Sequence, residues 1–340
     1  MELAIILAII VVSLALFFDF TNGFHDSANQ VATVIASRAL PPAAALVIAA
    51  MADFVGAYFF GTAVAETLGK GIVDPRALNA GASGVLVIIG AICGAILWNI
   101  ITWYFGMPSS SSHALIGGLV GSFVVGWGFA PIHWLKVFEI ILIMIVSPLV
   151  GFSVSYFFTR LAWRFSQRLT PKVNEVFKKM QIFSLVAQGI SHGTNDAQKT
   201  MGVITFSLVI LGLYNPGGSS SMPIPSWVIV VCSLALSLGT IIGGWRIIKT
   251  LGAGLYKIRP IHGFVSQVAS SAIMYLTAAF GFPISTTQVI SSSVMGAGAA
   301  TRIKMVRWQV AKEMAVAWLI TIPVSAILAG TIFYILNKIF

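Results

Sequence analysis

Apolar residues occur along the whole chain in long runs, which short polar or glycine- and proline-rich segments separate. As helices, such runs can cross the roughly 30 Å hydrocarbon core of a bilayer. The chain lacks the regular apolar–polar alternation of a membrane β-barrel. The apolar stretches are 3–18, 43–65, 84–105, 114–130, 137–158, 182–190, 201–213, 227–245, 264–282, 289–300 and 314–336. The pattern predicts an all-α polytopic membrane protein with about 10–12 membrane segments.

The composition supports this prediction and excludes a soluble globular domain. Of the 340 residues, 58% are hydrophobic and 9% are charged, whereas soluble domains carry about 25% charged residues. Cys93 and Cys232 both lie in apolar runs, so a disulfide framework or a cysteine metal cluster is not expected. The net charge of +10 does not indicate nucleic acid, because most basic residues flank apolar runs, where membrane topology explains them. The expected surroundings are a lipid bilayer.

Basic residues gather in three loops, which the positive-inside rule places in the cytoplasm. The first loop, 160–181, is predicted to link two transmembrane domains, 1–159 and 182–340. The loop 215–226 carries no charge, which suits the outer side of the membrane. These assignments place both termini outside, in a multi-pass protein of the plasma membrane. The other two basic loops are 246–259 and 302–312.

Two dissimilar motifs recur in the same order, which indicates an internal duplication. Asn22–Ser27 (NGFHDS) resembles His192–Ala197 (HGTNDA), and Phe105–His113 (FGMPSSSSH) resembles Phe280–Gln288 (FGFPISTTQ). An odd number of crossings in each half would invert the second copy. That is the plan of secondary transporters, whose substrate site lies between the copies near the membrane midplane. We expect two inverted-topology repeats with broken helices or re-entrant hairpins.

The first motif pair contains the candidate cation ligands. Asp26 and Asp196 lie in otherwise apolar surroundings, and a carboxylate in a membrane segment is costly and usually functional. Gly23 and Gly193 are expected to let the helices unwind and free backbone carbonyls as ligands. Carboxylate, amide and carbonyl oxygens together suit a small hard cation such as sodium. A kinked helix with hydrogen-bonded polar side chains is the structural alternative. The amide candidates are Asn22, Asn29 and Asn195.

The second motif pair contains the candidate ligands of an anion. A helix that starts after each proline would direct its free N–H groups and its positive end toward the break. Two such helix starts, lined with hydroxyls, would bind a tetrahedral oxyanion. Ordinary helix capping is the alternative, but four consecutive serines exceed what a cap requires. The candidates are Ser110, Ser111, Ser112, Ser285, Thr286 and Thr287.

Buried carboxylates beside an anion site favour phosphate over sulfate. They would repel a dianion unless cations lie between them, or unless the anion brings a proton to donate. Phosphate carries O–H groups at neutral pH and sulfate does not, and an unpaired buried acceptor costs about 1–3 kcal/mol. The residues therefore predict cation-coupled phosphate transport, with sulfate or another tetrahedral oxyanion as the alternative cargo.

Both motif pairs also resemble those of a known family. Gly23–Asn29 (GFHDSAN) and Gly193–Lys199 (GTNDAQK) look like the two G-x-N-D-x-x-N segments of the inorganic phosphate transporter (PiT) family. The proline–serine segments match that family's second pair, so the resemblance spans nearly the whole chain. It implies a low-affinity phosphate symporter driven by sodium ions or protons, with both termini outside. It also implies that Asp26 and Asp196 are cation-site carboxylates and that the hydroxyls contact phosphate.

Two residues depart from the family pattern and leave the coupling ion open. His25 stands in place of the usual first Asn; it could titrate near neutral pH or act as a neutral hydrogen-bonding residue. Lys199 stands in place of the last Asn in the second copy, three residues after Asp196. It could neutralise Asp196, attract phosphate or replace a cation. Further candidates for coupling or orienting roles are Gln198, His113 and Gln288.

Rival classes fit these residues less well. An intramembrane enzyme needs one asymmetric constellation of nucleophile, base and orienting group, whereas the polar residues here come in two matched copies. An anion channel does not need paired buried carboxylates. Asp53 lies in an apolar run without an acidic counterpart in the second copy, so it is not expected to serve the site. No cofactor beyond the coupling ions is expected, and the large lipid-embedded surface suggests a homodimer.

Overall fold

A computed structural model describes residues 2–71, 82–166, 170, 172–215 and 222–339. The described residues form twelve α-helices joined by short connections, with a π-helical turn at Thr250–Gly254 and a 3₁₀ turn at Ile303–Met305. The helices are α1 (Glu2–Ala36), α2 (Pro42–Phe59), α3 (Ala63–Gly71), α4 (Ala82–Tyr104), α5 (Ser111–Trp127), α6 (Trp134–Ser166), α7 (Val173–Ile210), α8 (Ser226–Ile242), α9 (Trp245–Lys249), α10 (Pro260–Ala279), α11 (Thr286–Thr301) and α12 (Trp308–Ile339).

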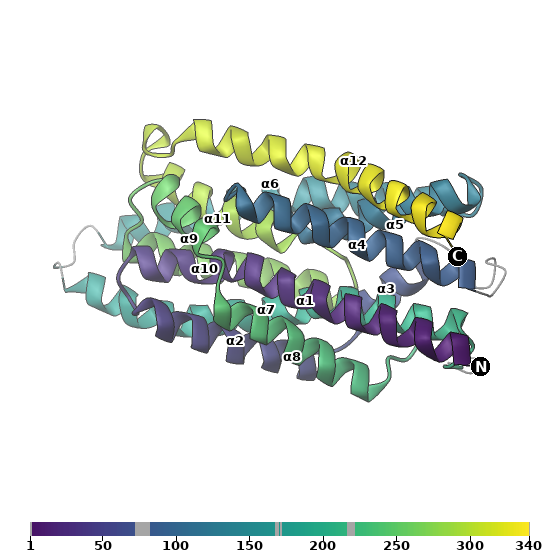
Figure 1. Cartoon of the computed structure of the whole chain (residues 1–340). Helices are drawn as coiled ribbons and strands as arrows, with labels where there is room; N and C mark the ends of the chain where they lie inside the picture. The colour runs from purple at the N-terminus through teal and green to yellow at the C-terminus, as the bar shows by residue number, and fades with distance from the viewer. Residues whose placement is uncertain (1, 72–81, 167–169, 171, 216–221, 340) are drawn as a thin grey trace.

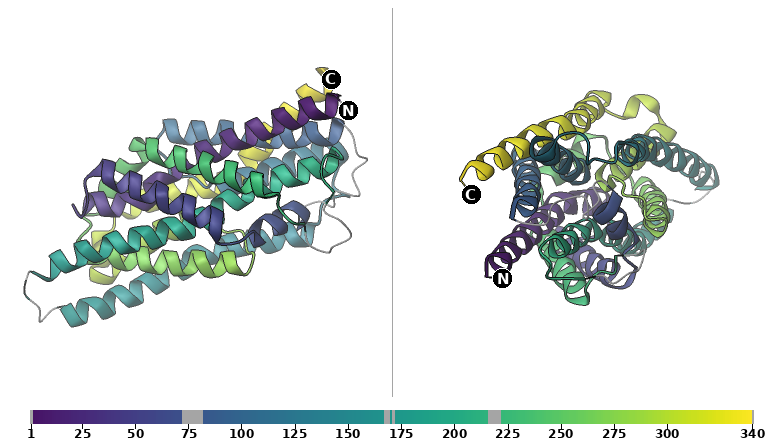
Figure 2. Two further views of the ribbon diagram at one scale, coloured as in Figure 1. Left: turned by 90° about the horizontal axis from the view of Figure 1, so that it is seen from below. Right: turned by 90° about the vertical axis from the view of Figure 1, so that its right-hand side faces the viewer.

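Most of the helices run roughly along one common axis, and both ends of the chain lie at the same end of the bundle (Figure 1). The end of α6 and the start of α7 lie at the opposite end, and so do α9 and the connection from α11 to α12 (Figures 1 and 2). The three groups of basic residues therefore lie together, away from both termini. This is the arrangement that the charge distribution predicted.

Several helices are long and apolar enough to cross a membrane. By length and composition α1, α2, α4, α6 and α12 meet this requirement, and α8 meets it together with Trp245–Gly252, a pair bent by 58° as in a broken span or a re-entrant loop. The shorter α5 is also apolar. The chain is therefore an all-helical, multi-span membrane protein, as predicted. The number of 10–12 segments stays a prediction.

Helix breaks lie at both proline–hydroxyl motifs, as the sequence predicts. α4 and α5 are separated by residues 105–110, and α10 and α11 by residues 280–285. Ser110 and Ser285 have extended backbone and accept a hydrogen bond from the N–H groups of His113 and Gln288. Both serines therefore act as N-caps that fix where α5 and α11 begin.

The expected unwinding at Gly23 and Gly193 is wrong, because α1 and α7 continue as regular helices through both carboxylate motifs. These glycines allow helices to cross closely instead. A Cβ on Gly23 would lie 2.0 Å from the carbonyl oxygen of Leu236 on α8, and one on Gly193 would lie 2.1 Å from that of Asp53 on α2. Small residues at such crossings let helix backbones approach in a membrane.

The helices before and after residues 167–171 pack on each other crosswise. α1 packs on α8 and α2 on α7; likewise α5 packs on α12 and α6 on α11. A second pair of glycines lies at the first two crossings. A Cβ on Gly56 would lie 2.0 Å from the carbonyl oxygen of Ile190, and one on Gly239 would lie 2.0 Å from that of Phe20. Each crossing thus has a counterpart formed by the other half of the chain.

We predict that Gly239→Ala lowers the melting temperature of the detergent-purified protein. The added methyl group meets backbone rather than a flexible side chain, and such overpacking costs about 1–3 kcal/mol. Thermal unfolding followed by tryptophan fluorescence measures the effect. Gly254→Ala is the matched control, because its nearest neighbour would be the Cγ2 of Thr250 at an ordinary 3.8 Å. Equal melting temperatures for the two variants would contradict the close crossing.

Candidate functional site

The carboxylates of the two motif copies meet in the interior of the bundle. Asp26 on α1 and Asp196 on α7 are both fully buried. Thr286, the first residue of α11, has its hydroxyl 3.4 Å from Oδ2 of Asp26 and 3.2 Å from Oδ2 of Asp196. Residues that lie far apart in sequence thus form one polar cluster at the start of a helix.

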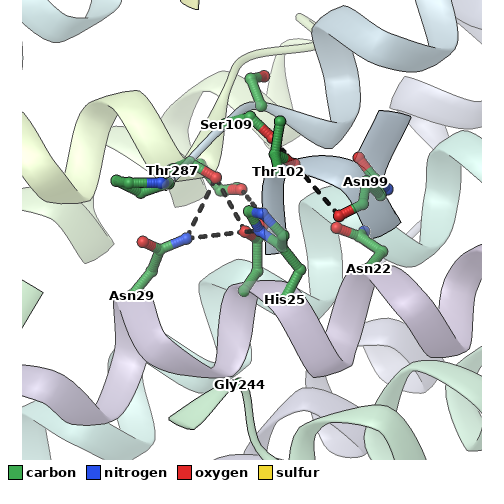
Figure 3. Close-up of polar contacts among 12 residues, drawn as sticks. Asn22, His25, Asn29, Asn99, Thr102, Ser109, Gly244 and Thr287 are labelled. Atoms are coloured by element: carbon green, nitrogen blue, oxygen red, sulfur yellow. Dashed lines mark hydrogen bonds and ion pairs between the residues drawn. The ribbon is translucent and has the colours of Figure 1, made fainter. Parts of the chain in front are cut away.

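Around Asp26, the side chains of the first motif and of the α11 start contact one carboxylate oxygen. Its Oδ1 accepts hydrogen bonds from Nδ2 of Asn29 at 2.9 Å and from the Thr287 hydroxyl at 2.9 Å. Nδ1 of His25 lies 3.1 Å from the same oxygen. Asn29 also donates to Oγ1 of Thr287 at 3.1 Å. Figure 3 shows His25 and Asn29 on the side of α1 that faces Thr287.

Around Asp196, the contacts come from its own helix α7 and from α1. Nζ of Lys199 donates to Oδ1 of Asp196 at 2.6 Å, and Nδ2 of Asn22 donates to Oδ2 at 3.0 Å. Lys199 also donates to the Ser112 hydroxyl at 2.5 Å. Ser112 in turn donates to the carbonyl oxygen of Ile284 at 3.0 Å, which joins the start of α5 to the break before α11. The two helix breaks therefore touch.

A buried histidine that the sequence reasoning did not select lies between the two carboxylates. Nε2 of His192 is 3.5 Å from Oδ2 of Asp196 and 3.9 Å from Oδ2 of Asp26. Its Nδ1 lies 2.9 Å from Oδ1 of Asp53. The available signal was its position four residues before Asp196, which places both side chains on one face of a continuous helix.

Asp53 was not expected to serve the site, but the structure connects its carboxylate to the cluster through His192. Its carboxylate accepts both Nε2 of Gln30, at 2.9–3.0 Å, and the Thr240 hydroxyl, at 2.7 Å. His192 links Asp53 to the central carboxylates of Asp26 and Asp196. A carboxylate inside an apolar span is itself a signal of function, whether or not the other repeat matches it.

Other predicted residues lie next to the cluster without joining it. Asn195 donates to the carbonyl oxygen of Met274 at 2.6 Å. Gln198 donates to the carbonyl oxygen of Gly61 and accepts the N–H of Val64. These two amides fasten α7 to its neighbours. The remaining predicted residues lie at the two helix starts, where all are buried: Ser110, Ser111, His113, Ser285 and Gln288.

The cluster contains buried oxygen atoms that no donor satisfies among the described residues, which suits a cation or protons. Ligand atoms of Asp26, His192 and Asp196 all lie within 4.8 Å of one another, close enough to surround one small ion. Among the described residues, the amide oxygens of Asn22 and Asn29 are buried and find no hydrogen-bond partner. Buried acceptors are normally satisfied, so these oxygens are available as ligands. The residues present therefore fit a sodium ion as well as protons.

A multi-span helical bundle with a buried carboxylate and hydroxyl cluster, placed where two helix breaks meet, defines a membrane transporter of small ions. Ionisable residues in this position mark ion and substrate pathways. The helix starts at α5 and α11 supply the positive ends that attract anionic groups.

Comparison with known proteins identifies the kind of transporter. The model of the phosphate transporter family matches residues 22–329. A probable low-affinity inorganic phosphate transporter of Bacillus subtilis (strain 168) is 44% identical over the full length of both chains. A relative of the same description from Mycobacterium tuberculosis (strain ATCC 25618 / H37Rv) is 43% identical, covering 97% of this chain and 78% of its own.

A solved structure described as a sodium-dependent phosphate transporter has the same fold. Its TM-score is 0.87 at 24% identity, and the match covers 98% of this chain and 100% of that one. The chain belongs to the phosphate transporter family, as the resemblance to the PiT family predicted. It is a transporter that carries phosphate across a membrane, and the prediction that it is not an enzyme is confirmed.

We predict that Thr286→Val lowers phosphate uptake about tenfold or more, because hydrogen bonds to charged groups contribute about 1.5–3 kcal/mol. The substitution keeps the branched shape and removes the hydroxyl that faces both carboxylates. Initial rates of radiolabelled phosphate uptake, normalised to protein in the membrane, measure the effect. Thr286→Ser retains the hydroxyl and should transport within about twofold of the parent protein. Parental uptake by the valine variant would contradict the role given to Thr286.

Proposed function

We propose that the protein imports inorganic phosphate by symport with a cation, sodium ions or protons, and that phosphate binds between the starts of α5 and α11. One observation carries this proposal: Thr286 at the start of α11 contacts both Asp26 and Asp196. The surface that would bind the anion is therefore also the surface that would bind the cation.

The helix starts support the anion part of the proposal. The first turns of α5 and α11 carry N–H groups without intrahelical partners, and both helices direct their positive ends at the break. Ser112 joins the two breaks through the carbonyl oxygen of Ile284, and Lys199 brings a positive charge to the same point. Phosphate fits better than sulfate, because its O–H groups can donate to the neighbouring carboxylates, and sulfate has none to donate.

The carboxylates support the cation part. Asp26 and Asp196 are fully buried, and Lys199 is paired with Asp196, so a negative charge remains beside the anion site and repels a dianion. A cation or a proton bound at the cluster removes that repulsion and makes room for phosphate. Binding of the cation therefore favours binding of the anion, which is the thermodynamic basis of symport.

The packing supports alternating access by two inverted halves, 1–159 and 182–340, joined by the linker 160–181. The crosswise pairs α5–α12 and α6–α11 have the pattern expected of two copies related by a pseudo-two-fold axis. The site would then lie near the midplane, with α4–α5 and α10–α11 as hairpins that enter from opposite sides. The basic loops favour the cytoplasm for the linker and the outside of the plasma membrane for both termini.

Phosphate uptake into proteoliposomes tests the proposed function. Sodium and proton gradients are imposed separately at clamped membrane potential, with excess sulfate as competitor. We expect uptake against a concentration gradient with one of the two ions and less than twofold inhibition by sulfate, because sulfate leaves the carboxylates unpaired. Uptake that neither gradient drives would contradict symport. Full inhibition by sulfate would indicate that the protein transports sulfate or another tetrahedral oxyanion rather than phosphate specifically.

We predict that Asp26→Asn abolishes cation-driven uptake and leaves membrane insertion unchanged. The amide keeps the size of the carboxylate and removes the charge that would hold the cation. Glu175→Gln is the matched control, because Glu175 is an exposed carboxylate on α7, and this variant should transport like the parent. Cation-dependent uptake of normal size by the Asp26 variant would contradict the assignment of Asp26 to the cation site.

A further inference from the structure

The two copies of the first motif hold their carboxylates in matching ways. In the first copy, Asn29 lies three residues after Asp26, and its Nδ2 contacts Oδ1 of Asp26 at 2.9 Å. The same Nδ2 contacts Oγ1 of Thr287, in the first turn of α11, at 3.1 Å. One side chain thus ties the carboxylate on α1 to a hydroxyl at a helix start.

In the second copy Lys199 takes the place of Asn29. It lies three residues after Asp196, and its Nζ contacts Oδ1 of Asp196 at 2.6 Å and the hydroxyl of Ser112 at 2.5 Å. Ser112 has the same position in its proline–hydroxyl motif as Thr287 has in the other. The geometry is repeated, but a neutral amide in one copy is a positively charged ammonium in the other.

The amine of Lys199 is held inside the protein next to Asp196. Its side chain is 2% exposed and Asp196 is 0% exposed, and an ammonium is buried in this way only when it is paired. The ammonium is covalently attached to α7 and contacts the carboxylate at the distance of a charge-assisted hydrogen bond. It compensates the charge of Asp196 without any ion from solution.

Among the described residues, the first copy has no Lys or Arg beside its carboxylate; Nδ1 of His25 and Nε2 of His192 lie 3.1 Å and 3.9 Å from Asp26, and a histidine is charged only when it is protonated. Asn29 brings no charge to Asp26, and its amide oxygen is buried without a hydrogen-bond partner among the described residues. An amide can offer an oxygen to a cation, whereas an ammonium is a donor only. The first copy therefore keeps a carboxylate without a fixed positive charge beside it and an amide oxygen that can coordinate a cation.

We propose that the ammonium of Lys199 permanently takes the place of a coupling cation at Asp196, so that a mobile cation binds at Asp26 and not at Asp196. This inference rests on the proposed symport and deepens it, because it sets the number of cations that accompany each phosphate. Replacing the ammonium by an amide would create a second mobile site. Adding an ammonium at Asn29 would remove the first.

Phosphate binding to the purified, full-length protein in detergent tests this inference. Radiolabelled inorganic phosphate is titrated at a series of sodium concentrations at fixed pH, and at a series of pH values at fixed sodium. The slope of log(1/Kd) against log cation activity gives the number of cations taken up with phosphate. The difference in slope between variants cancels the ionisation of phosphate itself.

Lys199→Asn is expected to raise this slope by one for the coupling ion, so that each tenfold fall in cation activity weakens phosphate binding tenfold more than in the parent. Lys199→Arg keeps the charge and is expected to keep the parental slope. Asn29→Lys is the reciprocal change and is expected to lower the slope by one. Lys178→Asn is the surface control, because Lys178 pairs with Glu175 at the same spacing on α7, 2.8 Å apart and exposed.

Parental slopes for both Lys199→Asn and Asn29→Lys would overturn the inference while leaving symport intact. Loss of phosphate binding in Lys199→Asn at every cation activity, with binding retained in Lys199→Arg, would also overturn it and make Lys199 a phosphate ligand. If Lys199→Asn does not fold, the slope of Asn29→Lys decides, since an unchanged slope overturns the inference. Parental protein that binds phosphate without any cation dependence would instead refute the proposed symport.

Discussion

Two buried carboxylates on the packed helices α1 and α7, held against one threonine hydroxyl, are the constraint on which the rest of the structure depends. Asp26 and Asp196 meet at Thr286 in an interior where an unpaired charge costs several kcal/mol. Every neighbouring group reduces that cost in one copy or the other. Amides and hydroxyls donate to Asp26, whereas an ammonium and an amide donate to Asp196.

The surrounding fold brings these groups together and keeps them close. Glycines at the α1–α8 and α2–α7 crossings allow backbones to approach to distances that any side chain would prevent. The serine caps fix the first residues of α5 and α11, so that the Thr286 hydroxyl contacts both carboxylates and the Ser112 hydroxyl contacts Lys199. In the proposed function the anion site shares its walls with the cation site, so no separate device is needed to couple the two ions.

The sequence predicts the larger features of this arrangement because they leave periodic or repeated signals. Long apolar runs predicted the multi-span helical bundle, and the Pro-Ser motifs predicted the breaks before α5 and α11. The duplicated motif predicted that Asp26 and Asp196 belong together. The charge pattern placed the basic loops at one end of the bundle, as the ribbon shows (Figure 1).

The finer features were missed because one residue type can serve two different structural purposes. Glycine signals both unwinding and close approach, and here Gly23 and Gly193 serve close approach. Since α7 stays helical, positions four before and three after Asp196 face the cluster, and its immediate neighbour Asn195 does not. That rule selects His192 and Lys199. The pairing of His192 with Asp53 depends on how α2 crosses α7, which no local pattern in the sequence records.

The most direct test of this account is an experimentally determined structure of the protein with phosphate and its coupling cation bound. The account predicts phosphate density between the starts of α5 and α11, within hydrogen-bonding distance of hydroxyls from both breaks. The same structure should place the coupling cation at Asp26 or, if the coupling ion is a proton, a protonated Asp26 carboxyl there. Phosphate bound to only one helix start, or at a site that touches neither break, would contradict the shared site.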